Sequence, residues 1–293
     1  METIESLRKK MKSAQDLQTV VKTMKALAAV NIRQYERAVA SVAEYYRTVE
    51  MGLQIVLQRG PVRVAHTERA HNRILHVVVF GSDQGLCGPL NDQIVSHAME
   101  SMDEMGIGDD RRRIIAVGAR AAVRLEDAGQ RVAEYFQVPS SASGIPSEVQ
   151  EMFIRMEEWR ARQEIDQLVL FYCRPVSGAS YRPHTQHLLP LDKGRLQEIE
   201  NMKWPTKSLP TYTMDWERLF SALVQEYLFV SLCRAFAESL ASENAGRLAS
   251  MQGAEKSIEE RLNDLTSRYY QQRQASITEE LLDIISGFEA LKE

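Results

Sequence analysis

Apolar residues recur every three or four positions along the first 60 residues, which is the spacing of one face of a helix. The first glycine is Gly52 and the first proline is Pro61, so the early pattern runs without a helix breaker. It predicts one helix over 1–60, far longer than the average globular helix of about 12 residues. The clearest apolar positions are Ile4, Leu7, Met11, Ala14, Leu17, Val21, Met24 and Ala28.

A second long helix is predicted over 211–293. The 83 residues that follow Pro210 contain no proline, and Asp215 is placed to cap the start of the helix. Gly246 and Gly253 interrupt the pattern, each at a cost of about 1 kcal/mol relative to alanine, which so long a helix tolerates. The apolar positions here include Leu219, Leu223, Tyr227, Val230, Leu240, Leu248, Met251, Ile258, Leu262, Leu265, Tyr269, Ile277, Leu281 and Ile285.

Neither helix is expected to stand alone in water with an apolar stripe exposed. The simplest arrangement winds the two around each other as an antiparallel coiled coil. Both stripes are narrow and rich in Ala, Ser and Gln, so we expect further partners to cover the pair.

The middle of the chain, over 74–200, has the pattern of an α/β domain. Short apolar runs rich in β-branched residues are typical of strands buried on both faces, and they occur at Ile74–Phe80, Arg113–Gly118 and Leu168–Cys173. Helical segments are predicted between them, at Asn91–Met105, Ala119–Ala128 and Ser147–Gln163. This alternation indicates a largely parallel sheet.

Three further segments complete the plan. A last strand is predicted at His184–Leu191, a flexible loop at Pro139–Pro146 and a linker at Lys203–Pro210. The predicted fold class is therefore α/β plus long helices, in which the N- and C-terminal helices form an antiparallel coiled coil around an inserted Rossmann-like α/β domain.

Composition narrows the function classes. The net charge is −4, whereas a general nucleic-acid binder is usually basic. No apolar run reaches the roughly 18 residues of a membrane span, so the chain is expected not to cross a bilayer. The start of the chain lacks the apolar core of a signal peptide. Three cysteines stand far apart, which indicates a reducing compartment and no disulfide framework.

The turn Gly81-Ser-Asp-Gln-Gly-Leu-Cys-Gly88 follows the first predicted strand, where an α/β fold binds nucleotides. Its backbone N–H groups could face a phosphate. However, it lacks the P-loop and dinucleotide-binding signatures, and Asp83 would repel an anion. A tight turn with positive φ at its glycines is the favoured interpretation. A small-molecule enzyme built on this turn stays the alternative.

Other reactive residues give no site. Cys87 could be a nucleophile at a helix N-terminus, but no partner base is identifiable, so a structural thiol is favoured. His184 and His187 are three apart and would face opposite sides of a strand. The basic stretch Arg8–Lys12 reads as a solvated face, or as one that meets an acidic partner. We therefore predict no catalytic, cofactor or metal site.

Four stretches together resemble the gamma subunit of F-type ATP synthases. Ile4–Arg33 is similar to the N-terminal helix of that family, and SDQGLCGPLN (Ser82–Asn91) is similar to its SDRGLCGGLN turn. SENAGRLASMQGA (Ser242–Ala254) resembles its SE-x-x-A-R-x-x-A-M segment, and RQASITEELLDIISG (Arg273–Gly287) resembles its C-terminal signature. The resemblance runs end to end, in the order of the predicted elements.

The resemblance implies a non-catalytic central rotor subunit without a cofactor, which couples ion-driven rotation to ATP synthesis or hydrolysis. Its implied partners are the alpha and beta subunits of the ring, the epsilon subunit and the membrane c-ring. ATP would bind in the ring. The implied location is the cytoplasmic face of the bacterial inner membrane, as a peripheral subunit that does not span it. A static scaffold rod is a third hypothesis.

The resemblance also implies roles for single residues. It carries Arg273, Gln274 and Thr278 onto positions that meet the beta subunits, and Met24, Lys25 and Arg247 onto nearby positions that affect coupling. The implied bearing at the shaft tip comprises Ile284, Ile285, Phe288 and Leu291.

Several residues depart from the family pattern. Gln84 stands where the family usually has Arg, and Pro89 replaces a glycine. Phe288 replaces a small residue, and Lys25 is basic where other members can carry an acid. These departures indicate a divergent branch, such as an alternative F-type ATPase, and leave the coupling ion open between proton and sodium. The chain has no inserted segment with paired cysteines, so thiol regulation is not expected.

Overall fold

The computed structural model describes residues 3–59, 74–161, 167–176, 180–191, 193–208 and 210–290. Two compact units emerge: Met1–Ala28 with Leu248–Glu293, and Ala29–Arg247. The long helices α1 (Ile4–Arg59) and α6 (Trp216–Ala290) each contribute residues to both units. The two predicted long helices are therefore present. Asp215 caps α6 as expected, because its carboxylate accepts a hydrogen bond from the backbone N–H of Arg218 at 3.4 Å.

The unit Ala29–Arg247 is built on a sheet which, over the described residues, has five strands in the order β3-β2-β1-β4-β5. The strands β1 (Leu75–Phe80), β2 (Arg112–Val117), β3 (Val132–Phe136) and β4 (Gln167–Pro175) are parallel, as the alternating pattern predicts. The edge strand β5 (Tyr181–Leu189) is antiparallel to β4.

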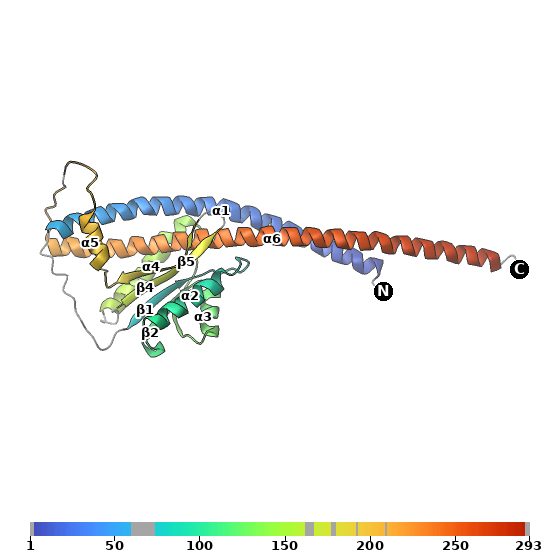
Figure 1. The fold of residues 1–293 in the computed structure, drawn as a ribbon, viewed down its shortest axis with the longest axis horizontal. Helices are drawn as coiled ribbons and strands as arrows, with labels where there is room; N and C mark the ends of the chain where they lie inside the picture. Colours follow the sequence, from blue (N-terminus) through green and yellow to red (C-terminus); the bar gives the residue numbers. More distant parts are fainter. Residues whose placement is uncertain are drawn as a thin grey trace. The chain divides into compact units, whose positions relative to one another are not determined.

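Helices cover both faces of this sheet (Figure 1). Val77 and Val79 of β1 point to one face, where they pack with α2 (Leu90–Glu104) and α3 (Ala119–Asp127). Val78 and Phe80 point to the other face, where they pack with α4 (Ile145–Ala161), α6 and α1. The near-continuous burial of the strands follows from this double cover.

Within the same unit, α1 and α6 contact each other in antiparallel order. Tyr46 and Tyr227 share a hydrogen bond between their hydroxyls at 2.8 Å, and the Trp216 indole donates to the carbonyl of Val56 at 2.9 Å. Residue numbers therefore rise along one helix as they fall along the other. The antiparallel pairing agrees with the sequence; the supercoil of a coiled coil stays a prediction.

The unit formed by Met1–Ala28 and Leu248–Glu293 has a small apolar core. Leu7, Leu265 and Tyr269 are buried together, with Ile4 and Met11 packed against them. The Arg8 guanidinium donates to the hydroxyl of Tyr269 at 3.1 Å. The stretch from Lys9 to Lys12 is mostly exposed, which agrees with a solvated basic face.

The structure corrects several predicted elements. The strand β3 and the helix α5 (Lys193–Asn201) were not expected. The predicted loop over 139–146 contains a 3₁₀ turn at Ala142–Gly144 and the first residues of α4. The predicted linker begins soon after α5 ends.

One helix in the described part of the chain, α6 over Trp216–Gly287, is long and apolar enough to cross a membrane by length and composition. The qualifying window is 44% buried within the protein, and core helices pass the same test. This is weak evidence for a span, so the expectation that the chain does not cross a bilayer stays a prediction.

Candidate functional site

The segment Ser242–Arg247 of α6 lies across the carboxyl ends of β1 and β4. The Ser242 hydroxyl donates to the carbonyl of Cys173, near the end of β4, at 2.9 Å. One turn later, a Cβ added to Gly246 would lie 2.5 Å from the carbonyl oxygen of Cys87. This corrects the view of Gly246 as a tolerated interruption, because glycine alone permits that approach. At Gly253 nothing lies within 4 Å, as expected of a tolerated glycine.

This edge is the topological switch point of the sheet, because the chain continues from β1 to β2 on one side and has β4 on the other. In open α/β sheets ligands bind in the crevice at this point. Here the helix of the chain itself lies against the loop that would contact such a ligand. Another side of the loop lines a surface pocket with Arg120, Val123 and Arg124, so the alternative of an enzyme built on the turn at 81–88 stays open.

The β1–α2 loop, residues 81–89, is tied to the rest of the insert (residues 74–201) by Asp83. One carboxylate oxygen of Asp83 accepts from the backbone N–H of Ala119 at 2.8 Å and from the Tyr135 hydroxyl at 2.7 Å. The other accepts from the backbone N–H of Val138 at 2.8 Å. Asp83 thus joins the loop to α3, to β3 and to the segment after β3.

We expect Asp83→Ala to destabilise the folded chain by about 1–3 kcal/mol, because three donors lose a charged acceptor. Urea unfolding of the purified chain measures this loss. Asp92→Ala is the matched control, since the Asp92 carboxylate pairs with Arg124 at the surface, where both side chains are more than half exposed. A loss for Asp83→Ala no larger than for Asp92→Ala would contradict the role of Asp83.

Other residues of the loop are packed in place. Gly88 has φ +67°, as predicted for a tight turn, but Gly81 and Gly85 have no positive φ, so the prediction is wrong for these two glycines. Leu86 has a positive φ, of +63°, which was not predicted. The Cys87 thiol is buried and lies 3.5 Å from the Ser82 hydroxyl and the Asn91 amide. Burial raises the pKa of Cys87, which suits a structural thiol and disfavours a nucleophile.

The described residues contain no group of three or more His, Cys, Asp or Glu side chains able to hold a metal ion. Burial, together with the nearby Arg174 guanidinium, lowers the pKa of His184 to about 4. His184 is therefore neutral at physiological pH and lies edge-on to Tyr172, at 5.2 Å between ring centroids.

Arg247 is placed inside the protein. It is 9% exposed, and one of its terminal nitrogens donates to the carbonyls of Gln84 and Gly85 and to Glu243, the last at 2.6 Å. Burial raises the pKa of Glu243, and the Arg247 charge opposes that rise. Arg247 therefore contacts the β1–α2 loop, and a role in coupling would act through this contact.

Met24 and Lys25 lie on α1 in the other unit, both half-buried. The Lys25 ammonium pairs with the Glu255 carboxylate of α6 at 2.5 Å. The basic residue that departs from the family pattern thus has an acidic partner within its own chain.

The remaining site residues that the structure describes lie on α6 beyond Tyr269, the last buried side chain in the described part of that helix. Arg273, Gln274 and Thr278 are exposed. The Thr278 hydroxyl donates to the backbone carbonyl of Gln274 at 2.9 Å. Ile284 is 68% and Ile285 53% exposed. The Phe288 side chain and Leu291 lie outside the described residues. Arg247 belongs to the other unit, Ala29–Arg247.

Sequence reasoning missed the roles of Asp83, Glu243 and Gly246. For Glu243 a signal existed, because Glu and Arg four residues apart on a helix form a pair. For Gly246 and Asp83 the partners are far away along the chain, so spacing could not identify them.

The comparisons with known proteins identify the family. The family model described as ATP synthase matches residues 3–291, which is almost the whole chain. The chain belongs to the ATP synthase gamma-subunit family. The resemblance found in the four sequence motifs is thereby confirmed.

Curated relatives agree over their full length. The chain is 28% identical over 322 residues to the ATP synthase gamma chain of Cyanothece sp., with 100% of each covered. It is 29% identical over 324 residues to that of Acaryochloris marina, with 99% of this chain and 100% of the relative covered.

Solved structures support the fold. A Euglena gracilis mitochondrial ATP synthase structure with OSCP, F1 and c-ring contains a chain with TM-score 0.64 and 16% identity, covering 98% of this chain and 94% of that one. The rotor of the same enzyme gives TM-score 0.62 and 18% identity, with 94% and 98% covered. Long terminal helices around a central sheet are thus shared with these ATP synthase chains.

Proposed function

We propose that this gamma-family chain is the central rotor of an F-type ATP synthase and couples rotation to ATP synthesis or hydrolysis in other subunits. The observation that carries the proposal is the family match from end to end, together with an exposed apolar surface near the end of the described part of α6. There Leu281, Leu282 and Ile284 are 54%, 58% and 68% exposed. Exposed apolar surface of this kind marks a binding interface.

The proposed partners are the alpha and beta subunits around the helices, with the epsilon subunit and the membrane c-ring at the insert. The N-terminal part of α1 also exposes apolar residues, since Leu17, Val20 and Leu27 are 53%, 53% and 58% exposed. Both helices thus leave surface for a surrounding protein. An apolar tip suits rotation, because directional hydrogen bonds there would resist turning.

The mechanism rests on asymmetry. Three identical beta sites would meet different faces of the same helix pair, and each face would favour a different beta conformation. Rotor angle and nucleotide affinity are then reciprocally coupled. Turning the rotor from the membrane side would release ATP, and hydrolysis would turn it back. The chain itself would not hydrolyse ATP. The complex would lie on the cytoplasmic face of a bacterial membrane, and its coupling ion would be proton or sodium.

Reconstitution tests this function. The purified chain is mixed with alpha and beta subunits from the same source, and the mass and ATPase activity of the product are measured. We expect a complex with one copy of this chain per ring and a gain in activity over the ring alone. If the ring is intact but does not bind the chain, the proposal is overturned. Tight nucleotide binding by the chain alone would favour the enzyme alternative.

A triple variant tests the contact residues. Arg273→Ala, Gln274→Ala and Thr278→Ala together are expected to lower the ATPase turnover of the complex by about tenfold, as when side chains worth about 1.4 kcal/mol in the transition state are lost. Thermal unfolding should stay unchanged, because all three residues are exposed. The control is the matched triple Arg261→Ala, Asn263→Ala and Ser267→Ala, also exposed on α6. Equal turnover in both triples would contradict the assignment.

A further inference from the structure

We propose that torque passes between α6 and the insert at the contact of Ser242–Arg247 with the carboxyl edge of the sheet. The inference rests on the proposed rotor function. Arg247 is the last residue of its unit, and from Leu248 onward α6 belongs to the other unit. A twist carried along the continuous helix α6 would be delivered to the insert at this contact.

The geometry of the contact resists rotation of the helix about its axis. Ser242 and Gly246 are one turn apart, so they share a face, and they touch the ends of two neighbouring strands, at Cys173 and after β1 at Cys87. On the adjacent stripe Arg247 donates to the carbonyls of Gln84 and Gly85 at 3.2 and 3.4 Å. These contacts reach backbone atoms, which cannot turn away as a side chain can.

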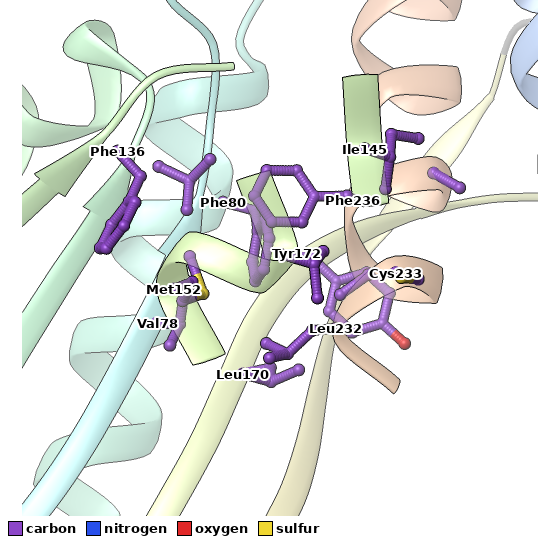
Figure 2. Close-up of a cluster of buried hydrophobic side chains, with 14 of the residues drawn as sticks. Val78, Phe80, Phe136, Ile145, Met152, Leu170, Tyr172, Leu232, Cys233 and Phe236 are labelled. Carbon is purple, nitrogen blue, oxygen red and sulfur yellow. The ribbon is translucent and has the colours of Figure 1, made fainter. Parts of the chain in front are cut away.

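Preceding turns of α6 contact the sheet through apolar packing and through an ion pair between Glu238 of α6 and Arg174 of β4, at 2.8 Å. Leu232, Phe236 and Leu240 lie against the sheet through apolar packing, which is not directional. It holds the helix on the sheet but opposes sliding less than a close-fitting backbone contact does. Figure 2 shows Leu232 and Phe236 of α6 among the side chains of Phe80, Tyr172 and Leu170.

The receiving loop is braced, so force applied to it enters the sheet. The Asn91 amide bonds both the backbone N–H and the hydroxyl of Ser82, at 3.0 and 2.9 Å. Asp83 ties the loop to Ala119, Tyr135 and Val138. Gly118, with φ +98°, lies against the backbone of Ser82, 2.7 Å from where a Cβ would stand. The loop thus connects α6 with β1, β2 and β3.

Two glycines of α6 provide a matched test. Gly246→Ala and Gly253→Ala gain the same helix propensity. Only the first places a methyl group 2.5 Å from the Cys87 carbonyl oxygen and 3.0 Å from the Tyr181 ring. The second meets nothing within 4 Å. Comparing the two variants therefore distinguishes disruption of the contact with the loop from a general change in the stability of the helix.

The measurement is torsional stiffness in the complex with alpha and beta subunits, with the ring immobilised. A bead is attached through Val123→Cys on α3, where the side chain is 51% exposed, whereas the native cysteines are all buried. The spread of bead angles during a catalytic pause reports the stiffness between ring and insert. We expect a wider spread for Gly246→Ala, and the original spread for Gly253→Ala.

Equal spreads for the two glycine variants would overturn the torque contact while leaving the rotor function intact. An unmodified chain that assembles but never rotates would overturn the rotor function instead. Should Gly246→Ala fail to fold, Ser242→Ala takes its place, since it removes the hydroxyl that donates to the Cys173 carbonyl and, within the helix, to the Glu238 carbonyl. A widened spread for Ser242→Ala supports the proposal, and an unchanged spread contradicts it.

Discussion

Replacement of Phe236 by alanine is expected to destabilise the unit Ala29–Arg247 by about 3–5 kcal/mol, the usual cost of emptying an aromatic core position. Phe236 of α6 is 1% exposed and meets the ring of Phe80 edge-on, at 4.9 Å between centroids (Figure 2). It is surrounded by side chains from the sheet and α4, so the cavity left behind has little freedom to collapse. Urea unfolding followed by circular dichroism measures the loss.

Ile154→Ala is the control for this prediction. Ile154 lies on α4 in the same unit but is 54% exposed. A surface substitution of this kind usually changes the free energy of unfolding by no more than about 0.5 kcal/mol. Losses of similar size for the two variants would mean that α6 is not part of the core described here.

The sequence predicted those elements whose burial is complete or strictly periodic. β1, β2 and β4 are buried on both faces, so their apolar runs are unmistakable. β3 was missed because it is an edge strand, where Ala133 and Tyr135 are exposed and Glu134 is only half-buried. α5 was missed because it is short and largely polar. Its ion pair with α1, between Arg195 and Glu50, joins residues far apart in the sequence.

For the candidate site, too, some features could be predicted from the sequence and others could not. The exposure of Arg273, Gln274 and Thr278 follows from the polar interruption in the helical pattern. The burial of Arg247 could not be predicted, because it depends on the loop at 81–89 reaching α6. Nor does a helical pattern distinguish Gly246 from Gly253, since only the tertiary contact at Cys87 makes the first glycine necessary.

Arg247→Ala is expected to lower the free energy of unfolding by about 3–5 kcal/mol. The substitution leaves the Glu243 carboxylate, 6% exposed, without the charge that neutralises it. Asp83 adds repulsion from the loop side. The double variant Glu243→Leu with Arg247→Met should recover most of the loss, because removing both charges from a buried pair is often neutral. Thermal or urea unfolding of the single and double variants measures both effects.

The stability lost in Arg247→Ala is expected to depend on pH, because it involves the ionised form of Glu243. The pKa of Glu243 in the folded chain is already raised above its ordinary value of 4.5 by burial, and Arg247 holds the rise down. In Arg247→Ala the pKa of Glu243 in the folded chain rises further. At pH values between the unfolded and the folded pKa of Glu243, the folded state therefore binds more protons than the unfolded state. Stability then falls as pH rises through that window. The deficit of Arg247→Ala should therefore shrink as pH is lowered from about 8 to about 5.

If the stability lost in Arg247→Ala does not depend on pH, the unneutralised Glu243 carboxylate is not the cause of the loss. The comparison also bears on coupling. If Arg247 acts through the β1–α2 loop, the double variant should regain stability yet keep a defect in rotation, since it lacks the bonds to the Gln84 and Gly85 carbonyls. If instead Arg247 turns outward to meet a beta subunit, Arg247→Ala should lower turnover at every pH without destabilising the isolated chain.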